Sequence, residues 1–183
     1  MERINIEEFL HKKTLIVGDI AKGKTKLTAF LVKKLIVNGY GNFITILDLA
    51  PERRDKIGGK IRDFIDVKNI RYLTTNILGP RMNAKNIEEL YDISRRNKNS
   101  IEKLFNIYEE KTSKILVIND LTLYLHAGDI ERLLNLIRFS ETFIGNAYKG
   151  KSFEIEIFKE FNQKERELVE RIERLMDIVI ELF

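Results

Sequence analysis

The sequence contains no cysteine and only two histidines, His11 and His126. Without cysteine, the chain forms no disulfide, has no catalytic thiol and binds no metal through thiolates. Two histidines far apart in the sequence also fail to supply the clustered imidazoles of a histidine-rich metal centre. Thiol chemistry and the common zinc centres are therefore excluded.

Long hydrophobic runs are also missing. No apolar stretch approaches the roughly 20 residues that a membrane-spanning helix requires. Residues 1–10 mix apolar and acidic side chains and lack the continuous apolar core of a signal peptide. We therefore expect a cytoplasmic protein with no membrane partner.

Neither sign of charge dominates. There are 32 basic and 28 acidic residues, which gives a net charge of +4. The charges are dispersed along the chain, whereas a dedicated nucleic-acid binder usually carries a clustered basic stripe. A weak nucleic-acid contact stays open but unsupported. The length of 183 residues and the apolar share of 44% predict one globular domain over residues 1–183.

Short apolar runs alternate with longer amphipathic segments, which is typical of a sheet connected by crossover helices. The runs predicted as strands are 14–17, 43–47, 70–74, 115–118, 142–145 and a closing run at 177–182. The predicted helices are 24–37, 83–110 with a break at 97–100, 130–138 after a cap at Asp129, and 162–176. Together they predict a three-layer α/β fold with a mostly parallel sheet of five strands and helices on both faces.

The strongest motif lies between the first predicted strand and the first predicted helix. It reads Gly18-Asp19-Ile20-Ala21-Lys22-Gly23-Lys24-Thr25, with the spacing G-x-x-x-x-G-K-T. Its glycines allow a tight turn whose backbone N–H groups point at an anion, and the helix that follows presents its N-terminus. Lys24 can reach the β- and γ-phosphates, and the Thr25 hydroxyl can bind magnesium (Mg2+). We predict a nucleotide-phosphate site over Gly18 to Lys26.

A magnesium-nucleotide site also requires an acidic residue at the end of an apolar strand. Asp120 lies at the end of the most apolar predicted strand, 115–118, and Asp48 directly follows the second predicted strand, 43–47. Because strand ends of this kind face the nucleotide crevice, we expect Asp120 to hold Mg2+ together with Thr25. Asp48 or Glu52 is expected to orient the attacking water. Lys24, Asp48, Glu52 and Asp120 form the predicted catalytic set.

The phosphate loop and the strand that ends at Asp120 resemble the Walker A and Walker B motifs of the P-loop NTPase superfamily. The resemblance implies the P-loop fold, binding of ATP with Mg2+, and hydrolysis of the β–γ phosphoanhydride. Many ATPases of the additional-strand type carry a glutamate directly after the Walker B aspartate. This chain has Leu121 there. Slow rather than motor-like hydrolysis is therefore expected.

Adenine is favoured as the base because no Asn/Thr-Lys-x-Asp guanine motif is present. The nearest strings, at 97–100 and 162–165, lack the required residues. Two alternatives stay open. One is a small-molecule or nucleoside kinase, which needs an acceptor pocket opposite the γ-phosphate. The other is a nucleotide-switched module that binds a protein partner or a second copy of itself.

Several further side chains could serve the site or merely the fold. The arginines in loop-like segments could close over the phosphates, the polar residues at strand ends could sense them, and the aromatic residues could stack on a base. A short glycine-rich segment could be a mobile loop. These candidates are Arg53, Arg54, Arg81, Asn119, Thr122, Asn146, His126, Tyr124, Phe143, Tyr148 and Gly58-Gly59-Lys60.

Overall fold

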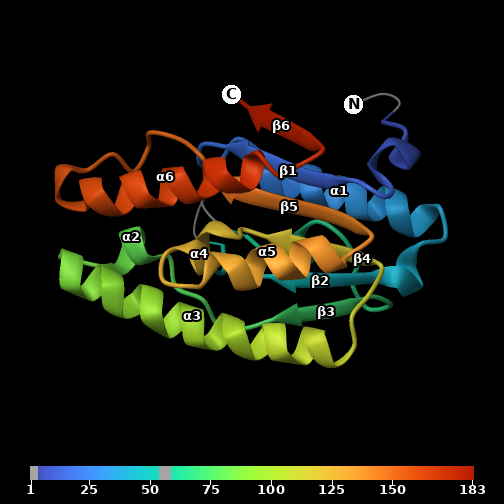
Figure 1. Cartoon of the computed structure of the whole chain (residues 1–183), viewed down its shortest axis with the longest axis horizontal. Helices are drawn as coiled ribbons and strands as arrows, with labels where there is room; N and C mark the ends of the chain where they lie inside the picture. Colours follow the sequence, from blue (N-terminus) through green and yellow to red (C-terminus); the bar gives the residue numbers. More distant parts are fainter. Residues whose placement is uncertain (1–3, 54–58) are drawn as a thin grey trace.

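The computed structural model describes residues 4–53 and 59–183. Its centre is one sheet of six strands in the order β3-β2-β4-β5-β1-β6, and all five strand pairs are parallel. Figure 1 shows the strands in this order, from β6 at the top to β3 at the bottom. The strands are β1 (Lys13–Gly18), β2 (Ile44–Asp48), β3 (Arg71–Thr74), β4 (Ile115–Asn119), β5 (Thr142–Tyr148) and β6 (Ile178–Leu182).

The expected number of five strands is wrong, because the sheet has six. The expected parallel pairing is confirmed, and every run predicted as a strand lies in the sheet. Both edge strands are only partly buried: all four residues of β3 are intermediate, and β6 alternates between intermediate and exposed. β5 stands between β1 and β4, so the strand that leads into the phosphate loop does not touch the strand that leads to Asp120.

Long crossover helices and short turns connect the strands. The helices are α1 (Lys24–Val37), α2 (Pro80–Asn83), α3 (Ile87–Glu110), α4 (Thr122–Leu125), α5 (Ile130–Phe139) and α6 (Lys159–Glu173). Short 3-10 turns are η1 (Ile6–Phe9), η2 (Gly41–Phe43), η3 (Ile61–Asp63) and η4 (Glu156–Phe158). The bounds predicted for α1 are confirmed. The Asp129 cap is also confirmed, since its carboxylate accepts a hydrogen bond from the Glu131 N–H at 2.9 Å.

Helix α3 differs from the prediction because it has no break near residue 97. Asn97 is buried, and its side-chain amide bonds both backbone groups of Leu78, the N–H at 3.2 Å and the carbonyl at 2.7 Å. Asn97 therefore holds the segment around Leu78 against α3 and does not interrupt the helix. The helix begins later than predicted, after Asn86, whose side chain caps the Glu89 N–H at 2.8 Å.

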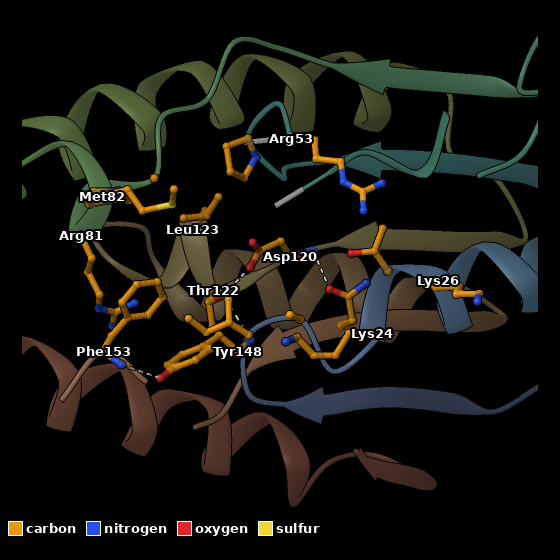
Figure 2. A pocket seen from close by; sticks show the side chains of 18 of the residues that line it. Lys24, Lys26, Arg53, Arg81, Met82, Asp120, Thr122, Leu123, Tyr148 and Phe153 are labelled. Carbon is orange, nitrogen blue, oxygen red and sulfur yellow. Dashed lines mark hydrogen bonds between the residues drawn. The ribbon is translucent and has the colours of Figure 1, made fainter. Parts of the chain in front are cut away.

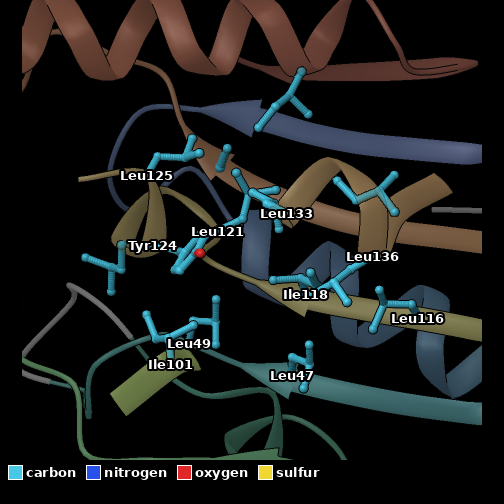
Figure 3. Packing of buried hydrophobic residues seen from close by; sticks show 14 of the residues in the cluster. Leu47, Leu49, Ile101, Leu116, Ile118, Leu121, Tyr124, Leu125, Leu133 and Leu136 are labelled. Atoms are coloured by element: carbon cyan, nitrogen blue, oxygen red, sulfur yellow. The ribbon is translucent and has the colours of Figure 1, made fainter. Parts of the chain in front are cut away.

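Alternate side chains along each strand separate two apolar layers, as the pleat requires. On one face, Leu15, Val17, Leu116 and Ile118 pack with α3, α4, α5 and α6. Figure 3 shows part of this cluster, in which Ile101 of α3 lies beside Leu49 and Tyr124 lies beside Leu121. On the other face a second cluster packs α1 with η1 and η3, and its strand residues are Ile16, Ile44, Ile46, Ile115, Val117 and Ile144.

The first glycine of the phosphate loop lies directly against the last strand. Gly18 pairs with Leu182 of β6, and a Cβ atom on Gly18 would lie 2.5 Å from the Leu182 carbonyl oxygen. A backbone oxygen cannot move aside cheaply, so no side chain fits without displacing β6.

We therefore expect Gly18→Ala to lower the free energy of unfolding by about 1–3 kcal/mol, the range seen for overpacked sites. Gly41→Ala is the matched control, because a Cβ there would meet only the Ile36 side chain at 3.9 Å. Urea unfolding followed by circular dichroism measures both variants. Equal stability of the two variants would contradict the close approach.

Candidate nucleotide-binding site

The segment from Gly18 to Gly23 links β1 to α1 and forms a turn with left-handed backbone at two points. Ala21 has a φ of 57° and Gly23 a φ of 91°. No side chain caps α1, which begins at Lys24. Alternating left- and right-handed residues turn successive N–H groups toward one concavity. The loop therefore has the backbone form of an anion site at the start of a 14-residue helix.

Lys24 lies across this loop. Its ammonium group donates a hydrogen bond to the Asp19 carbonyl at 2.7 Å and lies 5.9 Å from the centre of the Tyr148 ring. Burial lowers the pKa of Lys24, while the carboxylates of Asp120 and Asp19 act in the opposite direction. The structure thus brings the predicted phosphate lysine and the predicted metal carboxylate into electrostatic contact.

Asp19 connects the loop to the segment that follows β5. Its carboxylate accepts hydrogen bonds from the N–H groups of Ile20 at 2.6 Å, Lys151 at 3.1 Å and Ser152 at 3.2 Å. These bonds lower its pKa, although burial opposes them. Asp19 therefore shapes the loop through its own backbone neighbours and does not line the cavity described below.

Asp120 lies directly after β4 with a left-handed backbone, φ 57°. Its N–H donates to the Asn146 side-chain oxygen at 3.0 Å, and its carboxylate accepts a hydrogen bond from the Thr122 hydroxyl. Burial raises the pKa of Asp120, and Lys24 counteracts part of that rise. A half-buried carboxylate held this way, with one neighbouring ammonium group, suits a cation at its free side.

Asn146 sits at the centre of a buried hydrogen-bond network. Its side-chain amide donates to the Thr28 hydroxyl at 2.9 Å and to the Asn119 side-chain oxygen at 2.7 Å. Thr28 in turn donates to the Lys24 carbonyl at 3.0 Å. One chain of hydrogen bonds therefore connects β4, β5 and the first turn of α1. Asn146 also lines the cavity, while Asn119 is fully buried.

Asp48 belongs to the same network and is fully buried. Its carboxylate accepts hydrogen bonds from the Asn119 amide at 2.8 Å, the Tyr72 hydroxyl at 2.6 Å, and the backbone N–H groups of Ile61 at 2.6 Å and Ala50 at 3.4 Å. These donors occupy both oxygens. The expectation that Asp48 could orient water is therefore corrected, because its geometry is that of a structural anchor.

Glu52 lies at the edge of the site. Its exposed carboxylate forms an ion pair with Arg62 at 2.6 Å and does not line the cavity, although Pro51 and Arg53 on either side of it do. Lys60 is buried, and its ammonium group is bonded to the Ala50 carbonyl and the Thr74 hydroxyl, each at 2.7 Å. These two hydrogen bonds hold the Lys60 side chain in place, which contradicts the prediction that Lys60 belongs to a mobile loop.

A cavity of about 280 Å³ opens over the loop. Figure 2 shows Lys24 and Asp120 near its centre, with Tyr148 between Lys24 and the end formed by Arg81, Met82 and Phe153. Of the residues predicted to bind nucleotide, Gly18, Asp19 and Lys22 do not line it. The predicted ones that do are Ile20, Ala21, Gly23, Lys24, Thr25, Lys26 and Asp120.

The buried side chains of Arg81, Glu165 and His126 meet at the far end of the cavity. Arg81 donates to Glu165 at 2.7 Å and to Asn162 at 2.9 Å, and its guanidinium lies 5.1 Å from the centre of the Phe153 ring. The other Glu165 oxygen is bonded to His126 Nε2. His126 and Arg81 lower the pKa of Glu165 despite its burial. Arg81 and His126, two predicted candidates, therefore meet through a residue that was not predicted.

The remaining candidates divide between wall and core. Arg53, Thr122 and Tyr148 line the cavity, whereas Tyr124 and Phe143 belong to the apolar core. Arg54 and Gly58 lie outside the described residues. Glu165 was not among the predicted site residues, although the pattern of α6 contains a signal for it. The buried positions of α6 are Phe161, Glu165, Val169 and Ile172, so one acidic residue lies within an otherwise apolar stripe.

Within residues 4–53 and 59–183, no group of three histidine, aspartate or glutamate side chains is placed to hold a metal. A Mg2+ ion at this site would therefore have few protein ligands, such as one hydroxyl and one carboxylate. The phosphate oxygens of the nucleotide would supply further ligands. In the same described part, no helix has the length and apolarity needed to cross a bilayer.

These features define a fold. A parallel sheet with β5 between β1 and β4, a phosphate loop joining β1 to α1, and an aspartate at the end of β4 together constitute the P-loop NTPase fold. No family model matches the sequence, and no curated protein matches it.

Solved structures similar to the chain include the following three. The flagellar accessory protein FlaH from Methanocaldococcus jannaschii has a TM-score of 0.54 and 10% identity, over 99% of this chain and 77% of that one. An ATPase from the type III secretion system of pathogenic bacteria has a TM-score of 0.47 and 12% identity, over 95% of this chain and 51% of that one. Pif1 helicase from Candida albicans has a TM-score of 0.36 and 16% identity, over 100% of this chain and 39% of that one. At these identities only the fold is shared, and of these three comparisons that with FlaH, whose TM-score is 0.54, supports it.

The buried cluster at the far end of the cavity makes a prediction about stability. Because the folded-state pKa of Glu165 lies below its ordinary value of 4.5, its charge stabilises the fold above that pH, and this contribution is lost as the pH falls through the folded-state pKa. We expect Glu165→Gln to lower the free energy of unfolding by about 3–5 kcal/mol at pH 7, since it leaves Arg81 unpaired. The difference should narrow below pH 4.5.

Urea unfolding of both proteins between pH 7 and pH 3 measures this difference. Glu167→Gln is the control, because Glu167 lies on the exposed side of the same helix and should change stability by less than about 0.5 kcal/mol. A constant difference across the pH range would contradict the assignment.

Proposed function

We propose that the chain binds ATP with Mg2+ and slowly hydrolyses the β–γ phosphoanhydride. The observation that carries the proposal is that the phosphate loop, Lys24 and Asp120 share the walls of one cavity. A turn with the form of a phosphate site would by itself explain only the binding of an anion. A lysine and a half-buried carboxylate of raised pKa beside that turn favour a nucleotide with its metal. The adenine base rests on the missing guanine motif.

The chain's own groups would act mainly by position and charge. The N–H groups of residues 20–25 would hold the β- and γ-phosphates, and Lys24 would stabilise the charge that develops during transfer. The Thr25 hydroxyl and the Asp120 carboxylate would hold the metal. Bound Mg2+ would neutralise part of the negative charge of the phosphates. Arg81 would add a second cation near the far end of the phosphates.

Glu52 keeps its proposed role as the group that orients water, because its carboxylate is exposed between two residues of the cavity wall. Asp48 is not proposed for that role. Leu121, which follows Asp120, is buried in the apolar core and offers no acid in its place. Both points support slow hydrolysis.

Removal of the phosphate lysine tests the binding proposal. We expect Lys24→Ala to weaken binding of ATP with Mg2+ at least about tenfold, because hydrogen bonds to charged groups contribute about 1.5–3 kcal/mol. Lys33→Ala, an exposed lysine on the same helix, should leave binding unchanged. Isothermal titration calorimetry with a non-hydrolysable ATP analogue measures both. ATP affinity equal to that of the parent in Lys24→Ala would refute the site.

Hydrolysis has its own test. Glu52→Gln should reduce kcat by about 10²-fold or more while changing the affinity for ATP little, since the carboxylate is proposed to act on water rather than on the nucleotide. Glu156→Gln, which removes another exposed carboxylate in an ion pair, is the control. Phosphate release measured with a coupled assay gives kcat. An unchanged kcat would remove Glu52 from the mechanism.

A further inference from the structure

We propose that Thr122 is a positioning residue for the metal ion of the bound nucleotide. Its hydroxyl would hold one oxygen of the Asp120 carboxylate and leave the other oxygen free for Mg2+. Thr122 would therefore act through Asp120 and would not touch the metal itself. This inference rests on the proposed binding of ATP with Mg2+ and adds to it the residue that fixes the orientation of the metal ligand.

The two oxygens of the Asp120 carboxylate have different surroundings. Oδ1 accepts a hydrogen bond from the Thr122 hydroxyl at 2.5 Å, drawn as a dashed line in Figure 2, and this length is typical of a hydroxyl bonded to a charged carboxylate. The buried side-chain atoms that lack a partner in the described part of the chain are Thr14 Oγ1, Thr45 Oγ1 and His126 Nδ1. Oδ2 of Asp120 is not one of them and accepts no hydrogen bond from a described residue. It therefore keeps accessible surface in a side chain that lines the cavity.

The backbone at Asp120 does not fix this arrangement alone. Its φ of 57° is unfavourable for a residue with a Cβ and persists only where neighbouring contacts hold it. The Asn146 side-chain oxygen holds the Asp120 N–H at 3.0 Å, but the carboxylate still has two side-chain torsions. Among the described residues, Thr122 is the one that donates a hydrogen bond to this carboxylate. Its hydroxyl therefore limits the rotation that the backbone leaves open.

Thr122 is itself held in place. It is buried, with 2% of its surface exposed, and it begins α4 beside the cavity. Its branched side chain has few favourable χ1 angles. The hydroxyl oxygen accepts a long hydrogen bond of 3.4 Å from the Tyr148 N–H, and an ionised carboxylate can only accept, so the single hydroxyl proton points at Asp120. The end of β5 thus helps to orient the group that orients Asp120.

Lys24 gives this restraint a purpose. Burial lowers the pKa of Lys24 and raises that of Asp120, and the charge of each group opposes the shift of the other. The two groups nevertheless form no direct ion pair in the described part of the chain. The ammonium group donates to the Asp19 carbonyl at 2.7 Å, and the carboxylate is held by Thr122. A carboxylate free to rotate would turn toward the ammonium group, so Thr122 keeps one oxygen available for the metal.

Two buried threonines allow a matched test. Thr122→Val removes the hydroxyl that holds Asp120 and keeps the branched shape of the side chain. Thr45→Val makes the same change on β2, at a buried threonine whose hydroxyl has no partner in the described part of the chain. Thr122→Ser keeps the hydroxyl and removes only the methyl group. Together these variants separate the loss of one hydrogen bond from the loss of a buried hydroxyl in general.

The measured quantity is the factor by which Mg2+ strengthens the binding of a non-hydrolysable ATP analogue. Calorimetric titration of the full chain, once with Mg2+ and once with EDTA, gives this factor for each variant. We expect Thr122→Val to reduce it by about 10–100-fold, the loss typical when a group that orients a metal ligand is removed. The affinity in EDTA should change much less, because Lys24 and the loop amides remain. Thr122→Ser and Thr45→Val should keep the factor of the parent.

A second measurement uses the parent protein and does not depend on the folding of a variant. In a crystal structure with Mg2+ and the analogue, the Thr122 hydroxyl should stay bonded to one oxygen of Asp120 while the other oxygen faces the metal. A hydroxyl that binds the metal directly, or a carboxylate that has left Thr122, would overturn the proposal. Thr122→Ala removes the same hydroxyl and replaces Thr122→Val in the calorimetry if that variant does not fold.

The outcomes separate this inference from the proposed function. A parent that binds the analogue more tightly with Mg2+, beside a Thr122→Val variant that keeps the whole effect of Mg2+, would overturn the role of Thr122 and leave the binding of ATP standing. An equal loss in Thr122→Ser would assign the effect to the methyl group and would also overturn that role. A parent that binds no analogue, or binds it without any effect of Mg2+, would overturn the proposed binding of ATP with Mg2+ and this inference with it.

Discussion

The carboxyl edge of the sheet depends on a single buried hydrogen-bond network. Asn146 on β5 bonds Asn119 on β4, and Asn119 bonds Asp48 on β2. Amide side chains suit this place because each carries both donors and an acceptor, so they link β5 to β4 and β4 to the Asp48 carboxylate of β2. Through Thr28 and the Asp120 backbone, the same network fixes the helix that carries Lys24 and the turn that carries the Asp120 carboxylate. The relative positions of these two groups therefore follow from core polar contacts rather than from loop packing.

A second constraint acts at the opposite end of the cavity, where the buried Arg81–Glu165 pair joins α2 to α6. Buried ion pairs contribute little net stability but fix geometry, because breaking one leaves an uncompensated charge. His126 and the Tyr148 ring are placed by this pair and its aromatic surroundings. One wall of the cavity is thus set by the hydrogen-bond network of Asn146 and Asn119, and another is set by a buried ion pair.

Much of this arrangement was predictable from the sequence. The phosphate loop, α1 and the strand leading to Asp120 have local signals: a spaced glycine motif, a helical period and an apolar run ending at an acid. The roles of Asp48 and Glu165 were not predictable in this way. Asp48 has the same local context as Asp120, and only the Tyr72 and Ile61 donors, distant in sequence, separate an anchor from a site residue. The six apolar runs were all predicted locally, both edge strands included, whereas the number of strands that join one sheet depends on long-range pairing.

The contact between Gly18 and Leu182 joins the loop's first residue to the last strand. Loop and strand are separated by almost the whole sequence, so their docking is among the least local events in the fold and should come late in folding. During synthesis, the phosphate motif leaves the ribosome long before the strand that completes its outer wall. Competence to bind nucleotide should therefore appear only after β6 docks, so ATP would capture the finished domain rather than guide its assembly.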